Sequence, residues 1–120
     1  MNEQEAFEIA CDPATSPDVL QTLAHSSYFA VRSAVAKNPS VSLDVLAQLI
    51  GDPEWYVRAS AAENPSASPD LLRQVAKDLH WVVRMRTAQN PTTPKDVLEK
   101  LQTDADKDVR NAAIKSLRPM

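Results

Sequence analysis

A repeated arginine is the first candidate for binding chemistry in this chain. It follows a valine once in every unit of a 26-residue repeat, as Arg32, Arg58, Arg84 and Arg110. A guanidinium group presents a planar fork of N–H donors that suits carboxylates and phosphates, so a row of arginines could bind an anionic partner. Alternatively, each arginine pairs with the aspartate six residues before it or with loop carbonyl groups of a neighbouring unit. Repetition in every unit, beside a core valine, favours this structural interpretation.

Aromatic residues gather at a second repeated position, although they form only 5% of the chain. Phe29, Trp55 and Trp81 share this position, and their aromatic neighbours are Tyr28, Tyr56 and His80. Such a stripe is more often core or half-buried than a binding site, but it can also be a ridge that binds a partner, since Trp, Tyr and Arg are enriched at interface hot spots. Lys107 holds the position in the last unit, which favours a partly exposed ridge. The predicted partner-binding residues are Phe29, Trp55, Tyr56, His80, Trp81, Arg84 and Arg86.

A third repeated position holds an asparagine before proline, at Asn38, Asn64 and Asn90. Asparagine side chains satisfy backbone groups in turns, so we interpret these three, like the arginines, as structural ladders between units.

No arrangement of residues suggests catalysis, a metal site or a cofactor. The two histidines, His25 and His80, have no cysteine or carboxylate at a metal-ligand spacing. The single cysteine, Cys11, is expected to be a buried apolar residue rather than a nucleophile. Gly51 is the only glycine, so there is no glycine-rich phosphate loop. The sequence therefore predicts a protein that is not an enzyme.

Charge and composition narrow the partners. The chain has 13 Lys+Arg and 16 Asp+Glu, a net charge of −3, which removes general attraction to nucleic acid or an anionic membrane. Residues 61–120 carry a net +2 against −5 in residues 1–60, so nucleic-acid binding through the second half is the alternative function. The acidic N-terminus lacks signal-peptide features, no segment is long and apolar enough to span a membrane, and one cysteine suits a reducing compartment. We expect a cytoplasmic protein.

The candidate residues lie in a unit that repeats four times and must fold as two helices. The apolar residues of the first helix are spaced by three and four, and include Leu20, Leu46, Leu72 and Leu98. We expect its N-caps at Ser16, Ser42, Ser68 and Thr93, with Pro17, Pro69 and Pro94 in the first helical position. The second helix is expected to follow an N-cap at Ser26, Asp52, Asp78 or Asp104, and to end at Asn-Pro.

Neither helix can bury its apolar stripe alone, so stacked units must share one core. The expected fold is an all-α solenoid of about four 26-residue, two-helix repeats in a single domain. Its expected parts are a cap helix at 1–11, repeats at about 12–37, 38–63, 64–89 and 90–116, and a tail at 117–120. The atypical ends suggest a complete, capped array that is monomeric.

The unit resembles the leucine-rich repeat variant family over roughly residues 12–116. The resemblance rests on Leu-x-x-Leu, Asp-x-x-x-x-Val-Arg and Asn-Pro at fixed offsets, with the best copies from Asn38 to Pro65 and from Asn64 to Pro91. It implies a right-handed superhelix of alternating α and 3₁₀ helices, similar in style to HEAT repeats. Ser26 departs from the aspartate of this pattern in the first unit.

The family has no shared enzymatic activity, so the resemblance implies architecture only. From the residues we expect a non-catalytic scaffold that binds a protein or peptide on a repeat-built surface, without cofactor or metal.

Overall fold

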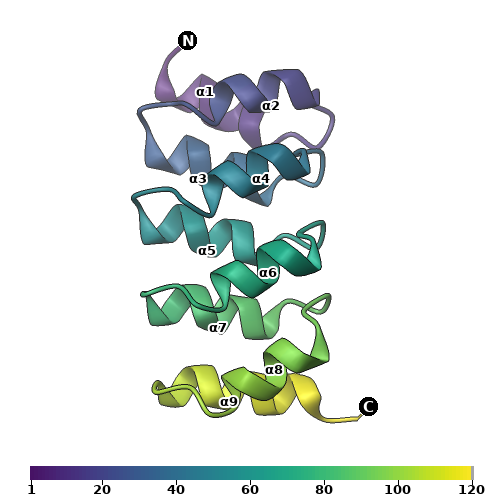
Figure 1. Ribbon diagram of the computed structural model, residues 1–120. Coiled ribbons are helices and arrows are strands. Elements are labelled where there is room, and N and C mark those ends of the chain that lie inside the picture. Colours follow the sequence, from purple (N-terminus) through teal and green to yellow (C-terminus); the bar gives the residue numbers. More distant parts are fainter. Residues whose placement is uncertain (120) are drawn as a thin grey trace.

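The computed structural model describes residues 1–119, and these form nine α-helices stacked in one elongated array (Figure 1). The array measures 45 × 24 × 21 Å, and the two ends of the chain lie at its opposite ends. The helices are α1 (Glu3–Cys11), α2 (Pro17–Leu23), α3 (Phe29–Lys37), α4 (Leu43–Leu49), α5 (Trp55–Glu63), α6 (Pro69–Val75), α7 (Trp81–Gln89), α8 (Lys95–Leu101) and α9 (Lys107–Leu117). The all-α solenoid predicted from the repeat is confirmed.

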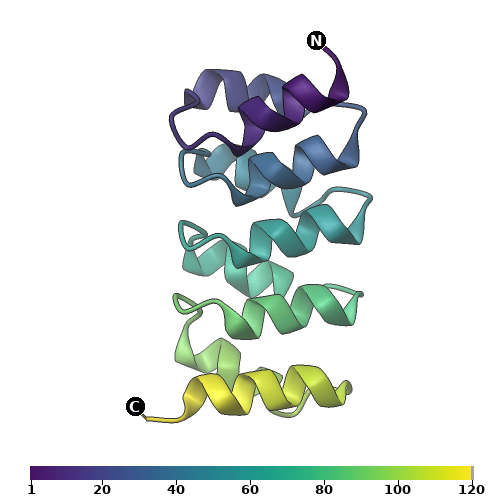
Figure 2. The ribbon, with the colours of Figure 1, turned by 180° about the vertical axis from the view of Figure 1, so that it is seen from behind.

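The helices form two layers. The odd-numbered helices stack directly on one another from α1 to α9, and they face the viewer in Figure 2. The even-numbered helices lie on the other side of the array, each beside the odd-numbered helices of its own and the preceding unit. All four even-numbered helices are seven-residue α-helices, so the 3₁₀ helices implied by the family resemblance are not found among the described residues.

Three even-numbered helices begin as the sequence predicts. Ser16, Ser42 and Ser68 accept hydrogen bonds from the backbone N–H three residues on, at 3.2–3.4 Å. The fourth, α8, begins one residue later than expected, because Pro94 is its N-cap and Lys95 its first residue. The Thr93 hydroxyl instead donates to the Thr87 carbonyl oxygen at 2.6 Å. Pro94 lies 26 residues after Ser68, so the repeat period alone predicts the correct N-cap. Thr93 was predicted only because threonine is a common N-cap residue.

The odd-numbered helices also begin later than predicted. α5, α7 and α9 start three residues after Asp52, Asp78 and Asp104, and their N-caps are two residues after these aspartates. Each aspartate accepts a hydrogen bond from the backbone N–H of the N-cap residue, at 2.9–3.0 Å. The aspartates therefore stabilise the turn before each helix. Each carboxylate can still accept hydrogen bonds from a side chain of another unit.

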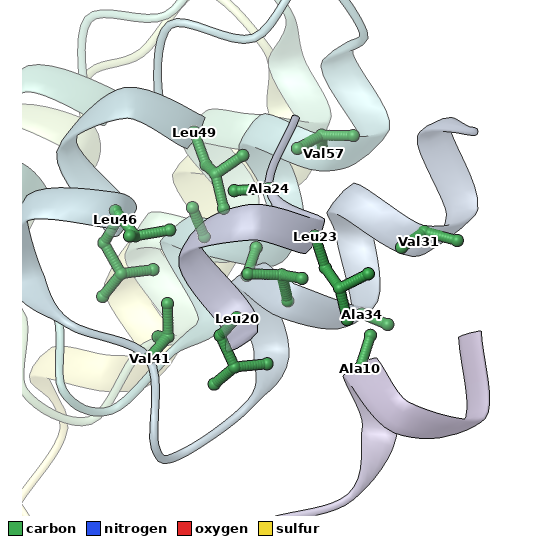
Figure 3. Packing of buried hydrophobic residues seen from close by; sticks show 14 of the residues in the cluster. Ala10, Leu20, Leu23, Ala24, Val31, Ala34, Val41, Leu46, Leu49 and Val57 are labelled. Carbon is green, nitrogen blue, oxygen red and sulfur yellow. The ribbon is translucent and has the colours of Figure 1, made fainter. Parts of the chain in front are cut away.

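Every unit contributes to the core, but the buried apolar residues among 1–119 form three clusters along the array rather than the single shared core expected from the sequence. Every unit supplies a fully buried valine before the repeated arginine and a buried leucine from the even-numbered helix; these are Val31, Val57, Val83 and Val109, and Leu20, Leu46, Leu72 and Leu98. Figure 3 shows the N-terminal part, where Leu20, Leu23 and Leu46 belong to the same buried cluster as Ala10 and Ala34. Each such leucine or valine stabilises the fold by about 1.5–3 kcal/mol relative to exposure. Small alanines between the odd-numbered helices allow their close approach.

The two ends follow the predicted pattern in outline. α1 packs against α3 as α3 packs against α5, so the first residues do form the second helix of a unit. At the other end α9 continues through Leu117, where the tail was expected to begin, and residue 120 lies outside the described residues. None of the described helices is long and apolar enough to cross a membrane.

Candidate functional surface

Five ring-bearing side chains form a continuous ridge over the first turns of α3, α5 and α7. We call Phe29, Trp55, Tyr56, His80 and Trp81 the aromatic ridge. Its four large apolar members are 39–50% exposed, and His80 is half-buried. Tyr28 beside it is also exposed. The repeated aromatic position is therefore on the surface and contributes nothing to the buried core between the layers.

The rings of the ridge contact one another from unit to unit. Trp55 and His80 stack with ring centroids 4.4 Å apart and planes 12° apart, and His80 lies 18° from the plane of Trp81 at 6.3 Å. Tyr56 meets both Trp55 and Phe29 edge to face, at 5.8 and 6.1 Å. Aromatic pairs of this kind each stabilise by about 0.5–1.5 kcal/mol beyond the area they bury. The ridge is thus held in shape before any partner arrives.

Two grooves adjoin the ridge on the face of the odd-numbered helices, and they meet at Lys37 and Tyr56. The first, of about 330 Å³, is lined by Phe7 and Cys11 of α1, by small residues and Lys37 of α3, and by Tyr56. The second, also of about 330 Å³, lies between α5 and α7 and is lined by Trp55, Trp81 and Met85 among others. Cys11 is exposed here, contrary to the expectation that it is buried.

Three charged side chains line the grooves. Arg86 donates to the Glu63 carboxylate, with Nε 2.9 Å from Oε1, so these two largely neutralise each other. The Lys37 ammonium lies over the Tyr56 ring, 5.4 Å from its centroid, and has no carboxylate within ion-pair distance among residues 1–119. Sequence reasoning singled out Arg86 and missed Lys37, because the 26-residue repeat places Glu63 and Gln89 at equivalent positions.

Arg84, predicted as a binding residue and as a ladder residue, lies in the ladder. Its Nε and Nη2 donate to Asp104 at 2.8 and 3.1 Å, and its Nη1 donates to the Asp78 carbonyl oxygen at 2.8 Å. With its guanidinium occupied in this way it is separate from the aromatic ridge. The structure thus brings together six of the seven predicted binding residues, five as the ridge and Arg86 as a groove wall.

The arginine ladder has the same geometry in three successive units. Arg32 and Arg58 bind Asp52 and Asp78 through the same bidentate fork, with Nε at 2.7–2.8 Å and Nη2 at 3.2 Å. The carboxylate partner belongs to the next unit, which corrects the expectation of the aspartate six residues earlier. That earlier residue supplies its carbonyl oxygen instead, as Asp52 does for Arg58 at 2.8 Å.

The ladder explains the departure at Ser26. An aspartate there would need an arginine at the ladder position of the preceding helix, α1, and that position is Ala6. Ser26 keeps the two local functions of the aspartate, since its hydroxyl accepts from the Tyr28 N–H and its carbonyl accepts from Arg32 Nη1. At the other end, Arg110 bonds only to the carbonyls of Asp104 and Ala105 among the described residues.

The ladder also shifts the pKa of two of its members. A hydrogen bond to Asp52, and the charge of that carboxylate, raise the pKa of Arg32 above its ordinary value against the opposing effect of burial. Burial by itself would raise the pKa of Asp104. Hydrogen bonds from Arg84 and from the Asp106 N–H, together with the charges of Arg84 and Arg110, lower it overall. Both ions are therefore favoured in the folded state.

The asparagines bind carbonyl groups of the preceding unit. Asn64 is 1% exposed, and its Nδ2 donates to the carbonyls of Ala36 and Asn38 at 2.8 and 3.2 Å. Asn38 and Asn90 make the equivalent pairs of bonds at 2.8–3.0 Å. Each Oδ1 accepts the backbone N–H two residues later, at 2.8–2.9 Å. The side chains thus satisfy carbonyls at the ends of α1, α3 and α5, and at the end of α7 the Ser116 hydroxyl donates to the Ala88 carbonyl oxygen at 2.6 Å.

Among residues 1–119, no three His, Cys, Asp or Glu side chains are placed to hold a metal ion. The stacked two-helix units, joined by one arginine and one asparagine ladder, define an α-solenoid repeat protein. Residues 29–54 match the sequence model of the leucine rich repeat variant family, the family that the repeat unit resembles. The matched segment is one 26-residue unit and includes α3, α4 and the loop leading to α5. No curated protein and no solved structure gives a significant match to the chain.

Proposed function

We propose that this protein is a non-catalytic scaffold that binds a protein or peptide across the aromatic ridge and its two grooves. The observation that carries the proposal is the exposure of Phe29, Trp55, Tyr56 and Trp81 in one contiguous row. Large aromatic side chains are normally withdrawn from water, and a rimmed apolar patch of this kind is typical of interaction sites.

The stiffness of the scaffold supports the same function. Side chains buried in the ladders tie each unit to the next, and the ring contacts fix the ridge itself. A surface that is already ordered loses little conformational entropy on binding, so more of the contact energy is expressed as affinity.

The alternative function, nucleic-acid binding through the second half of the chain, has less support. Of its arginines, Arg73, Arg84 and Arg86 each contact a carboxylate of the protein. Phosphate binding depends on cations that are available to replace counterions; these three of the ten cations in residues 61–120 are already paired, and the eight acidic residues of the same half repel phosphate. The alternative predicts binding that weakens steeply as salt is raised.

Selection of peptides from a random library displayed on phage tests the proposal. The intact chain is expected to enrich a family of related peptides. Trp55→Ala combined with Trp81→Ala should abolish this enrichment, because it removes the two largest rings of the ridge. Leu43→Ala is the matched control, since Leu43 is as exposed as the ridge residues but begins α4 on the opposite layer.

Circular dichroism and thermal unfolding must show that each variant keeps the fold. If the intact chain enriches no peptide family, or if the double variant enriches the same family equally well, the proposal is wrong.

A further inference from the structure

The spacing of the aromatic ridge selects among the conformations that a bound peptide could have. Its rings come from α3, α5 and α7, which stack along the 45 Å axis at about 10 Å per layer, the usual helix-packing distance. A peptide running along this axis meets an equivalent ring at each layer. Its own repeat must therefore be close to this layer spacing if its side chains are to make equivalent contacts.

A polyproline II helix fits this requirement. It rises about 3.1 Å per residue with three residues per turn, so the same face returns every ~9.3 Å. A β-strand returns to the same face after roughly 7 Å. An α-helix returns to nearly the same face after one turn of about 5.4 Å and again after seven residues, at about 10.5 Å, but with its side chains it is about 10–12 Å wide. A cylinder of that width is too wide to enter grooves of about 330 Å³.

From this match we infer that the aromatic ridge binds a proline-rich segment in the polyproline II conformation, with an acidic residue of that segment facing Lys37. The inference rests on the proposed function, which specifies only a protein or peptide, and it states which kind of peptide binds. Proline rings would lie against the exposed ring edges of the ridge, and every third residue would face a successive unit.

The orientation of the rings suits proline. Trp55, His80 and Trp81 have nearly parallel planes, 12° and 18° apart in succession, so their edges form a row, while the facing surfaces of Trp55 and His80 cover each other. Aromatic-lined surfaces are the usual receptors of proline-rich segments, because the preformed helix loses little entropy on binding. The ridge need not supply backbone partners, since the backbone of a polyproline II helix stays hydrogen-bonded to water.

The charges of the grooves select an acidic residue in the ligand. Glu63 and Arg86 form an ion pair at 2.9 Å, which leaves Lys37 as the groove cation without a carboxylate partner among the described residues. Its ammonium lies 5.4 Å from the Tyr56 ring centroid, so a carboxylate bound there would lie beside the ridge. The same charge disfavours a cationic ligand, such as a methylated lysine, that would otherwise suit aromatic rings.

A single-stranded nucleic acid fits the surface less well. Bases bind by stacking on aromatic faces while a row of cations follows the phosphates. The facing surfaces of Trp55 and His80 are already in contact at 4.4 Å, and a row of unpaired cations is missing from the residues that line the grooves. Nucleic acid is therefore an outcome to be tested against the peptide.

The test uses fluorescein-labelled peptides of about ten residues and fluorescence polarisation with the intact chain. The first peptide has proline at every third position and one central glutamate. In the second the same residues are permuted so that the threefold spacing is lost, and in the third lysine replaces the glutamate. We expect the first to bind at least about tenfold more tightly than the second and about fivefold more tightly than the third, differences of the size that one or two anchor contacts make.

Two variants relate the affinity to the ridge. Trp55→Ala with Trp81→Ala should weaken the first peptide by more than about tenfold. Lys37→Glu changes one exposed residue, keeps every ring, and should reverse the preference between the glutamate and lysine peptides. Leu43→Ala should leave all three affinities unchanged.

Three results would overturn the inference. One is equal binding of the first and second peptides by the intact chain. Another is an unchanged charge preference in Lys37→Glu. The third is a labelled oligothymidylate that binds more tightly than any peptide and loses affinity steeply with salt. If library selection yields proline-free peptides that need Trp55 and Trp81, the polyproline inference fails and the proposed function stands; if it yields no peptide, both fail.

Discussion

Replacing Asp78 with asparagine removes the charge from one rung of the arginine ladder with little change in shape. In the folded protein Asp78 receives Nε and Nη2 of Arg58 at 2.8 and 3.2 Å, and the backbone N–H of His80 at 2.9 Å. The two side chains of the pair are only 18% and 9% exposed. An asparagine keeps one acceptor oxygen for these three donors, so at least one buried guanidinium N–H loses its partner.

The expected loss in the free energy of unfolding depends on how exposed the Arg58–Asp78 ion pair is. Surface ion pairs contribute about 0–1 kcal/mol, whereas breaking a buried pair from one side costs about 3–5 kcal/mol. A pair that is mostly buried, with part of its hydrogen bonding retained by asparagine, should lose about 2–3 kcal/mol in the free energy of unfolding. Urea unfolding followed by circular dichroism measures this value.

Arg58→Met, Asp78→Leu and the double variant complete the test. Replacing both partners by apolar residues of similar size removes the unpaired charge, so the double variant should recover most of the stability lost by either single variant. Arg110→Met is the matched control. Arg110 has the same place in its unit, but bonds to backbone carbonyls and to no carboxylate among the described residues, so its loss should be about 1 kcal/mol or less. A loss below about 0.5 kcal/mol for Asp78→Asn would show that the ladder contributes no more than surface ion pairs.

Further predictions concern the other contacts between and within units. Asn64→Ala should cost about 3 kcal/mol in urea unfolding, because it removes the side-chain donor of the buried Ala36 carbonyl, one of the two donors of the Asn38 carbonyl, and the acceptor of the Ser66 N–H; a loss under about 1 kcal/mol would contradict this. Leu72→Ala should cost about 2–5 kcal/mol by the same measurement, and Ser68→Ala about 1 kcal/mol, and the reverse order would refute the core assignment. Because the pKa of Asp104 is lowered by folding, its ionised form stabilises the protein above the unfolded value near 3.8, and that contribution disappears as the pH falls through the lower folded value. Carboxyl-carbon NMR of Asp104 should titrate below pH 3.8, and a midpoint at or above this value would disprove the shift.

The repeat made most of the fold predictable from one sequence. Positions that recur in every unit identified the buried valines and leucines, the two helices of each unit and their stacking. Helix starts were less predictable, because an aspartate is an equally good residue for an N-cap and for the turn that precedes one. Asp52 was therefore assigned as an N-cap. The actual N-cap of α5 is Glu54, whose backbone N–H donates to the Asp52 carboxylate.

The surface was only partly predictable, for a different reason. The sequence identified the rings of the aromatic ridge by their shared position, but helical spacing alone does not say on which side of a stacked helix they emerge. Lys37 was missed because its importance comes from Tyr56, a residue of the next unit, whose ring it covers. Contacts between units depend on how far each helix is shifted along its axis relative to its neighbour in the stack. The repeat period of the sequence does not give this shift. The Arg32–Asp52 pairing was missed in the same way.

The ladder and the aromatic ridge are one construction, since the aspartates that join the units also fix the backbone from which the rings project. Asp78 binds Arg58 of the preceding unit and, with the same Oδ1, accepts the N–H of His80. His80 in turn stacks on Trp55, and its Nδ1 accepts the N–H of Val82 at 3.1 Å. A change of position between two units would therefore move His80 away from Trp55 and divide the ridge. This explains how a buried ion pair, which often contributes little net stability, can be useful here: it determines where the rings of successive units lie relative to one another.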